Sequence, residues 1–275
     1  MSNHPEILIA GAGFGGIAMG VALKKAGIEN FTIHEKSSEV GGVWRDNIYP
    51  GSACDVPSLL YAYSFEPDFG WSTHYALHDE ILAYMKHCAE KYGLMSHIRL
   101  SSEITAARFD PDEAWRIETA AGEEIRADIF ISAVGIFDRP ALPQIPGLKD
   151  FAGPQFHSAR WDYSQPLEGK RVGVIGTGAS TIQFVPAIAP RVKQLLVFQR
   201  SPQYVLSKHD PGRAPRGSLA WRRWQRLAIF WKFGRGTRRG KPVQGFSGKQ
   251  NHKSGFARQT DARLSPGRQA GLAIQ

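Results

Sequence analysis

A glycine-rich turn close to the N-terminus limits the chain to a small set of folds. An apolar stretch at residues 7–10 precedes Gly-Ala-Gly-Phe-Gly-Gly at 11–16, and a second apolar stretch, 31–35, ends on Glu35. In a strand–turn–helix–strand unit, Gly-x-Gly-x-x-Gly lets the backbone approach a pyrophosphate, and the acid accepts hydrogen bonds from ribose hydroxyls. The pattern predicts a dinucleotide-binding βαβ unit. A glycine-rich turn without a ligand is the alternative.

The same pattern recurs later in the chain. The apolar stretch 171–175 precedes Gly-Thr-Gly-Ala-Ser-Thr at 176–181, and a further strand is expected at 194–198. This second unit ends on Arg200 instead of an acid. A guanidinium can bind a 2′-phosphate through two hydrogen bonds, which favours NADPH over NADH. Thr181 departs from the third glycine of the motif, and an ordinary solvated side chain is the alternative for Arg200.

The two units predict an α/β fold with two dinucleotide-binding (Rossmann-like) domains on parallel sheets, the second incomplete. An acid in one unit and an arginine in the other predict a flavoprotein that binds FAD and NADPH. Between them, residues 98–126 alternate strand-like pieces with turns, and a proline-rich connection at 140–146 is the expected boundary. We expect part of an FAD-binding domain over 1–145, part of an NADPH-binding domain over 146–232, and a basic tail of low order over 233–275.

The positive charge of the chain is confined to its C-terminal part. The formal net charge is +9, yet residues 211–275 hold 15 of the 34 basic residues and only one of the 25 acidic ones. We interpret residues 233–275 as a frameshifted or misassembled end, so no nucleic-acid partner is expected. A genuine nucleic-acid-binding tail is the alternative. Residues 221–231 could form one basic amphipathic helix.

Simple features exclude other classes of protein. Two cysteines, Cys54 and Cys88, are too few for a disulfide framework or a four-cysteine zinc site, and no metal is expected. The uncharged stretch 7–23 is interrupted by glycines and is shorter than the roughly 20 residues that a spanning helix needs. We therefore expect a cytoplasmic protein without a transmembrane segment.

Three motifs resemble those of the class B flavin-dependent monooxygenases, most closely the Baeyer–Villiger type. The first lies within residues 41–61, where Gly-Gly-Val-Trp, Tyr-Pro-Gly and Cys-Asp precede Tyr61. The second is Phe-x-Gly-x-x-x-His-x-x-x-Trp-Asp at 151–162, just before the second glycine turn. The third is Val-Phe-Gln-Arg-Ser-Pro at 197–202. The resemblance covers about residues 5–210.

The resemblance implies an enzyme that uses NADPH, FAD and O₂ to insert one oxygen atom into a ketone through a peroxyflavin. Asp55 is the implied catalytic residue, as the electrostatic partner of an active-site arginine. The residues expected to bind FAD are Gly11, Gly13, Phe14, Gly15, Gly16, Glu35, Gly42, Val43, Trp44, Asp55, Tyr61 and Ile104. Those expected to bind NADPH are Gly176, Thr177, Gly178, Ala179, Ser180, Arg200 and Ser201. His157 either hydrogen-bonds the connection between the domains or donates a proton.

The resemblance also implies that the chain is C-terminally truncated. Members of the family are roughly twice as long, and neither their catalytic arginine nor the returning half of their FAD domain has a counterpart in this sequence. We therefore expect weak FAD binding and no oxygenation. Oxygenation at nitrogen or sulfur is one alternative function. An inactive nucleotide-binding remnant, or a basic nucleic-acid-binding module, is another.

Overall fold

The structure is a computed structural model that describes residues 5–110, 114–203 and 272–274. The chain divides into two compact parts, and every described residue belongs to the larger one. The larger part is Met1–Ala214 with Gly271–Gln275, and the smaller part is Pro215–Ala270. The predicted amphipathic helix at 221–231 and most of the predicted tail therefore lie outside the described residues.

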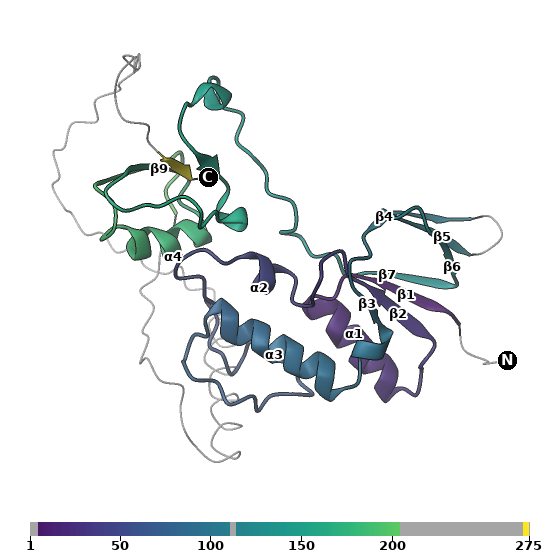
Figure 1. The fold of residues 1–275 in the computed structure, drawn as a ribbon. Helices are drawn as coiled ribbons and strands as arrows, with labels where there is room; N and C mark the ends of the chain where they lie inside the picture. The colour runs from purple at the N-terminus through teal and green to yellow at the C-terminus, as the bar shows by residue number, and fades with distance from the viewer. Residues whose placement is uncertain (1–4, 111–113, 204–271, 275) are drawn as a thin grey trace, which may run out of the picture. The chain divides into compact units, whose positions relative to one another are not determined.

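A parallel four-stranded sheet carries the first glycine turn (Figure 1). Its order is β3-β2-β1-β7, with β1 (Ile7–Ala10), β2 (Phe31–His34), β3 (Ile98–Arg99) and β7 (Ile129–Ser132). All four residues of β1 are buried, as expected for an apolar strand with neighbours on both sides. Because β2 and β7 both run parallel to β1, the segments that leave these three strands meet at one edge of the sheet.

Two helices pack with this sheet and bury its core. They are α1 (Phe14–Lys25) and α3 (His78–Lys91). α1 buries Ile17 and Val21, which lie four residues apart and therefore on one face of the helix. The same core cluster contains Ile33 of β2, together with Tyr84 and Met85 of α3. The buried face of α1 thus covers the strands that carry the glycine turn.

An antiparallel sheet follows between β3 and β7 in the chain. Its order is β4-β5-β6, with β4 (Ile104–Phe109), β5 (Trp115–Thr119) and β6 (Glu124–Ala127). A small core cluster of Leu8, Ile117 and Ala127 joins it to β1. The alternation of strand-like pieces and turns over 98–126 therefore corresponds to real strands, with Gly122 at φ +82° in the turn between β5 and β6.

A second parallel sheet carries the second glycine turn. Its order is β10-β9-β11-β8, with β8 (Gln155–Phe156), β9 (Arg171–Ile175), β10 (Gln194–Phe198) and β11 (Leu272–Ile274). Helix α4 (Ala179–Ile188) follows β9 directly. The core here includes Val172, Val174, Phe184 and Ile188. β9 and its neighbours thus form the second unit that the sequence predicts.

Strand β11 lies within the range of the predicted tail, 233–275, of which the structure describes only residues 272–274. Leu272–Ile274 pairs in parallel with both β9 and β8, although it lies within the predicted 233–275 tail. Three consecutive apolar residues suffice for this, because the ladder is made by backbone groups that any short extended segment supplies.

The remaining helices are short. They are α2 (Val43–Asp46), η1 (Met95–His97), η2 (Leu148–Asp150) and η3 (Ser158–Arg160). Among the helices of the described residues, none has the length and apolar character required to cross a membrane.

Candidate dinucleotide-binding sites

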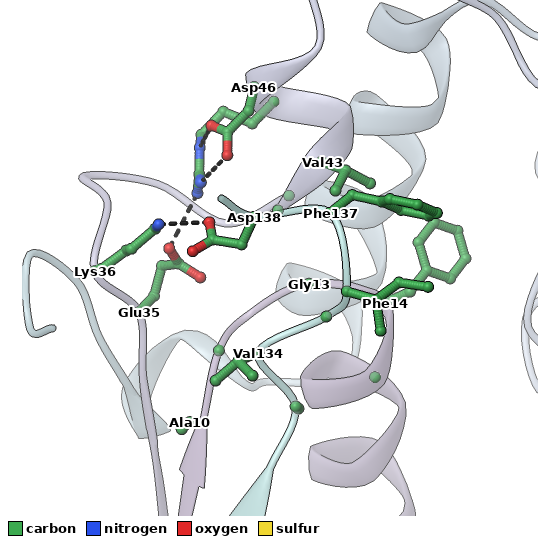
Figure 2. A pocket seen from close by; sticks show the side chains of 18 of the residues that line it. Ala10, Gly13, Phe14, Glu35, Lys36, Val43, Asp46, Val134, Phe137 and Asp138 are labelled. Atoms are coloured by element: carbon green, nitrogen blue, oxygen red, sulfur yellow. Dashed lines mark hydrogen bonds and ion pairs between the residues drawn. The ribbon is translucent and has the colours of Figure 1, made fainter. Parts of the chain in front are cut away.

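A cavity of about 600 Å³ opens at the edge of the first sheet where β1, β2 and β7 end (Figure 2). Most of the residues expected to bind FAD line it, and they come from the glycine turn, the end of β2, α2, the segment between α2 and α3, and the start of β4. These residues are Gly11, Gly13, Phe14, Gly15, Glu35, Gly42, Val43, Trp44, Tyr61 and Ile104. Gly16 and Asp55 are not among the residues that line it.

The glycines allow backbone segments to pack closely around the turn, because a side chain at these positions would collide with the neighbouring backbone. Gly11 has φ +102°, and a Cβ there would lie 2.7 Å from the carbonyl oxygen of Ala133. A Cβ on Gly42 would lie 3.2 Å from Gly13 Cα, so two backbones meet at one wall of the cavity. α1 begins directly after Gly13, and no side chain caps its first N–H groups. A helix N-terminus of this kind attracts anions such as a pyrophosphate.

Gly16 serves the packing of the turn. A Cβ at this position would lie 1.9 Å from the carbonyl oxygen of Gly11. That distance is far below contact between non-bonded atoms, so only glycine lets α1 start this close to β1. Gly16 therefore has a packing role in the structure, and its role in FAD binding stays a prediction.

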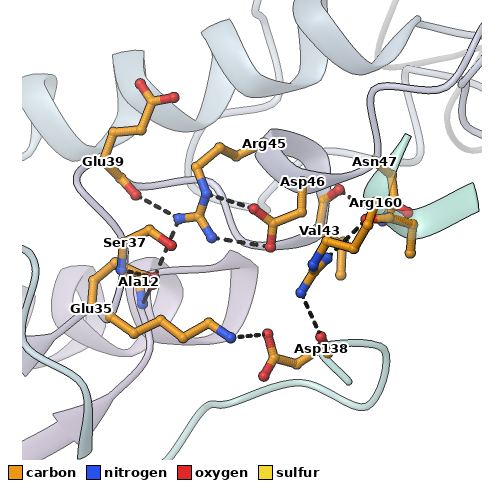
Figure 3. A network of polar contacts seen from close by, with 12 residues as sticks. Ala12, Glu35, Ser37, Glu39, Val43, Arg45, Asp46, Asn47, Asp138 and Arg160 are labelled. Carbon is orange, nitrogen blue, oxygen red and sulfur yellow. Dashed lines mark hydrogen bonds and ion pairs between the residues drawn. The ribbon is translucent and has the colours of Figure 1, made fainter. Parts of the chain in front are cut away.

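Glu35 directly follows β2 at the base of the cavity and is buried. Its Oε2 accepts a hydrogen bond from Ala12 N–H (2.9 Å), and its Oε1 accepts one from Ser37 N–H (3.0 Å). Oε1 also accepts from Arg45 Nη1 at 3.2 Å (Figure 3). Two carboxylate oxygens have about four acceptor sites. The carboxylate is therefore fixed in place and retains the capacity to accept from a ribose hydroxyl.

Arg45 and Asp46 also line the cavity, and no sequence motif indicated them. The Arg45 guanidinium binds Asp46 through Nε (2.8 Å) and Nη2 (3.1 Å), and it donates to the Glu39 carbonyl at 2.6 Å. Burial lowers the pKa of Arg45, but the carboxylates of Asp46 and Glu35 outweigh burial and raise it. The only signal in the sequence was a pair of opposite charges inside an otherwise apolar and aromatic motif.

Aromatic side chains form the cavity wall near α1. Trp44 Nε1 donates to the Tyr61 hydroxyl at 3.1 Å, and the two rings meet edge to face. The Phe14 ring lies 4.9 Å from the Tyr61 ring, and the Tyr63 hydroxyl donates to the Phe14 carbonyl at 2.9 Å. Burial raises the pKa of Tyr61. This wall offers flat apolar faces suited to an aromatic ring system.

A further part of the cavity wall is a chain segment that the sequence motifs did not indicate. Residues 133–139, which leave β7, line the cavity. Asp138 Oδ1 accepts from Lys36 Nζ at 2.5 Å, and the Asp138 carbonyl accepts from Arg160 Nη2 at 2.9 Å. The segment reaches the cavity because β7 runs parallel to β1 and delivers its following loop to the same edge of the sheet.

The second glycine turn has the local geometry of the first. Gly176 has φ +106°, and its N–H donates to the Phe198 carbonyl at 2.9 Å. Gly178 precedes the first residue of α4 without a side-chain cap, and a Cβ on either glycine would meet no described atom within 4 Å. Since β10 runs parallel to β9, the exposed Arg200 follows at the same sheet edge as the turn.

The other residues expected to bind NADPH cluster near this turn. Thr177 lies within it, Ala179 and Ser180 open α4, and Ser201 accepts at its carbonyl from Gln199 Nε2 at 3.1 Å. Thr181 is accommodated half-buried in the first turn of α4. The structure therefore brings the turn and the end of β10 together at one edge.

His157 makes a local hydrogen bond. Its Nδ1 accepts from Ala159 N–H at 3.0 Å, which caps η3. Burial and the nearby Arg160 lower the pKa of His157. This bond lies within residues 157–159, and the two roles expected for His157 stay predictions. Trp161, four residues on, is buried against Phe184 with ring centroids 5.3 Å apart.

Asp55 lies away from the first cavity and contacts the second unit. Its Oδ1 accepts a hydrogen bond from Gln183 Nε2 of α4 at 3.0 Å. Within residues 5–110, 114–203 and 272–274, no group of three or more His, Cys, Asp or Glu side chains could hold a metal ion.

Two parallel units, each with a glycine turn before a helix, place the chain among proteins with two Rossmann-type dinucleotide-binding folds. The chain belongs to the flavin-binding monooxygenase-like family, whose model matches residues 5–229. This confirms the family resemblance and the fold class that the motifs predict.

Individual relatives agree with this assignment. A Baeyer–Villiger monooxygenase of Streptomyces coelicolor is 46% identical over 209 residues, which are 76% of this chain and 40% of the relative. One of Pseudomonas aeruginosa is 41% identical over 234 residues, which are 85% of this chain and 44% of the relative. The chain thus spans about two fifths of the length of these relatives.

Solved structures resemble this one to a similar extent. A closed cyclohexanone monooxygenase superposes with a TM-score of 0.71 at 34% identity, covering 84% of this chain and 43% of that one. An oxidised steroid monooxygenase bound to NADP gives 0.70 at 37% identity, covering 81% and 43%. The OTEMO complex with FAD and NADP gives 0.74 at 31% identity, covering 84% and 45%.

Proposed function

We propose that the first cavity binds FAD, that the second glycine turn binds NADPH, and that the chain represents part of a Baeyer–Villiger-type monooxygenase. The observation that carries the proposal is the cavity of about 600 Å³ at the edge of the first sheet, with the glycine turn and Glu35 on its wall. Its volume lies within the roughly 300–1,000 Å³ typical of cofactor sites.

The residues of the first site fit FAD. The backbone at Gly11 and Gly13, with the uncapped start of α1, suits a pyrophosphate. The fixed Glu35 carboxylate would accept from the ribose of the adenosine half. The wall formed by Trp44 and Tyr61 would contact the flavin half and keep water from it. FAD, when bound, supplies electron transfer from NADPH and the activation of O₂.

The residues of the second site fit NADPH. The start of α4 after Gly178 would bind the pyrophosphate, and Arg200 would bind the 2′-phosphate through its guanidinium. Thr177 and Ser180 add hydroxyl groups beside the turn. Asp55, which contacts α4, would lie on the side of the first unit that faces the nicotinamide. We propose a ketone and O₂ as the substrates.

FAD titration of the full 275-residue chain tests this function, with flavin absorbance and fluorescence as readouts. We expect weak but saturable binding, because the chain spans only about two fifths of its relatives. Glu35→Gln should weaken binding roughly tenfold, since it removes a charge-assisted hydrogen bond. Glu29→Gln is the matched control, because Glu29 is exposed and pairs with Lys24.

Addition of NADPH then tests the second site and the chemistry. NADPH should bleach the bound flavin, and a cyclic ketone compared with a tertiary amine distinguishes ketone oxidation from heteroatom oxidation. Failure of the wild-type chain to bind FAD at millimolar protein and ligand, or equal affinity of Glu35→Gln and the wild type, would contradict the proposal.

A further inference from the structure

The side chain of Gln183 ties α4 to the segment 49–55 through four hydrogen bonds. Its Oε1 accepts from the Tyr49 hydroxyl (2.9 Å) and from Ala53 N–H (3.3 Å). Its Nε2 donates to the Ala53 carbonyl (2.8 Å) and to Asp55 Oδ1 (3.0 Å). An amide offers two donors and two acceptor sites, so these bonds use its full capacity and fix its orientation.

The packing around these hydrogen bonds is close. Gly51 has φ +79°, and a Cβ there would lie 2.9 Å from the backbone carbonyl oxygen of Gln183. Tyr49 is only 8% exposed and belongs to the core of the second sheet, where its ring meets Phe184 edge to face. A segment of the first unit is therefore built into the core of the second.

The same segment is anchored to the first unit on its other side. Cys54 N–H donates to the Ala76 carbonyl at 2.9 Å, and His78 N–H donates to the Ser52 carbonyl at 3.0 Å. In the chain it lies between Trp44 and Tyr61, which both line the first cavity. Apart from an isolated bridge at Ala53, the segment has no helix or strand. Its conformation therefore depends on these side contacts.

We infer that Gln183 is a positioning residue that couples the two dinucleotide sites by holding segment 49–55, with Asp55, against α4. The inference rests on the proposed function. Gln183 lies one turn beyond the start of α4, where the second dinucleotide would bind. A ligand there orders α4 and, through Gln183, the segment that adjoins the first cavity. The first ligand to bind loses the conformational entropy of ordering these segments, so the second ligand binds more tightly. The effect on affinity is the same in both directions.

The experiment measures the affinity of the full chain for FAD by flavin fluorescence, without and with saturating NADP⁺. The oxidised nucleotide is the probe because it leaves the flavin oxidised. For the wild type we expect NADP⁺ to tighten FAD binding by about fivefold or more, the lower end of typical coupling. The readout is a ratio of affinities and needs no turnover.

Two variants and one control isolate the role of the amide. Gln183→Leu removes the four hydrogen bonds at similar side-chain volume. Gln183→Glu keeps the acceptor oxygen, but its second oxygen replaces the donor and faces the oxygens of Ala53 and Asp55. Both should reduce the coupling to less than about twofold. Gln194→Leu is the control, because Gln194 lies on β10 in the second sheet, away from segment 49–55, and its side chain accepts a hydrogen bond from Arg171 Nε at 3.0 Å. It should retain the wild-type ratio.

Three results would overturn the inference. One is coupling of wild-type size in both Gln183 variants. Another is binding of both dinucleotides by the wild type without coupling. The third is melting of both variants at least about 10 °C below the wild type, which would give Gln183 a role in stability alone. If the wild type binds neither dinucleotide, the proposed function fails as well, and this outcome is distinct from the other three.

Discussion

Arg45 Nη1 lies 3.2 Å from Glu35 Oε1, and the two side chains are only 10% and 5% exposed. The guanidinium therefore orients the acid that follows β2, while the N–H groups of Ala12 and Ser37 hold its two oxygens. The Glu35 carboxylate is thus paired within the protein before any ligand binds.

Arg45→Met is expected to destabilise the protein. It leaves the carboxylates of Glu35 and Asp46 without their shared cation, and breaking a buried ion pair costs about 3 kcal/mol. Urea denaturation should show a lower midpoint with an unchanged slope. FAD affinity should fall in parallel, because Glu35 loses the group that orients it.

Arg45→Lys is the matched control for this prediction. The ammonium retains the charge but cannot bridge both carboxylates as the planar guanidinium does. We expect a loss of stability between those of the wild type and Arg45→Met. A change in unfolding free energy below about 0.5 kcal/mol in Arg45→Met would contradict the role assigned to the pair.

A second prediction concerns pH and the buried Glu66. Burial alone would raise the pKa of Glu66, but hydrogen bonds from Lys91, Tyr92 and His87 outweigh burial and lower it below the ordinary value of 4.5. A carboxyl whose pKa is lower in the folded state contributes stability above its unfolded pKa and loses it as pH falls through the folded value. Stability should therefore fall as the pH drops below about 4.5.

Glu66→Gln tests this dependence. The amide cannot titrate, so the variant should be less stable at neutral pH and lose less stability from about pH 5 to pH 3. Thermal melting across this range measures both effects. Glu90→Gln on the exposed side of α3 is the control and should follow the wild type. Parallel stability curves for Glu66→Gln and the wild type would contradict the prediction.

Local sequence patterns predicted the parts of the fold that neighbouring residues determine. The glycine turns at 11–16 and 176–181 fix backbone conformation within a few residues, and the strands beside them are short apolar runs. Glu35 could be placed at the first cavity for the same reason, since it lies at the end of the next strand.

Contacts between distant segments could not be predicted in this way. Gln183 and Ala53 are 130 positions apart, and nothing in the spacing of either indicates the partner. The loop after β7 reaches the cavity only because β7 pairs with β1, far earlier in the chain. The resemblance assigned Asp55 to FAD, whereas its position depends on how the segment around it packs against α4.

A third prediction tests the packing role of Gly16. In Gly16→Ala, the added Cβ would lie 1.9 Å from the Gly11 carbonyl oxygen, so either α1 or the glycine turn must move. We expect a loss of about 3 kcal/mol in unfolding free energy, at the upper end of the cost of overpacking, and loss of FAD binding. Denaturant unfolding and the FAD titration measure the two effects.

The control is Gly70→Ala, where a Cβ would meet nothing within 4 Å and the backbone φ is not positive. Its stability and FAD affinity should match those of the wild type. A Gly16→Ala protein with wild-type stability and wild-type FAD affinity would show that the turn accommodates a Cβ at this position. That result would contradict the packing role assigned to Gly16.

A fourth prediction concerns the choice between the two nicotinamide cofactors. Arg200 follows β10 at the edge where the second glycine turn lies, and its exposed guanidinium is placed to bind a 2′-phosphate. Arg200→Gln should weaken NADPH binding about tenfold, because a charge-assisted hydrogen bond is lost, and leave NADH affinity within about twofold. Fluorescence titration with each nucleotide measures both affinities.

Arg191→Gln, which removes an exposed partner of Glu168 in the same unit, controls for net charge. Equal weakening of NADPH and NADH in Arg200→Gln would assign the arginine to general electrostatic attraction instead of recognition of the 2′-phosphate.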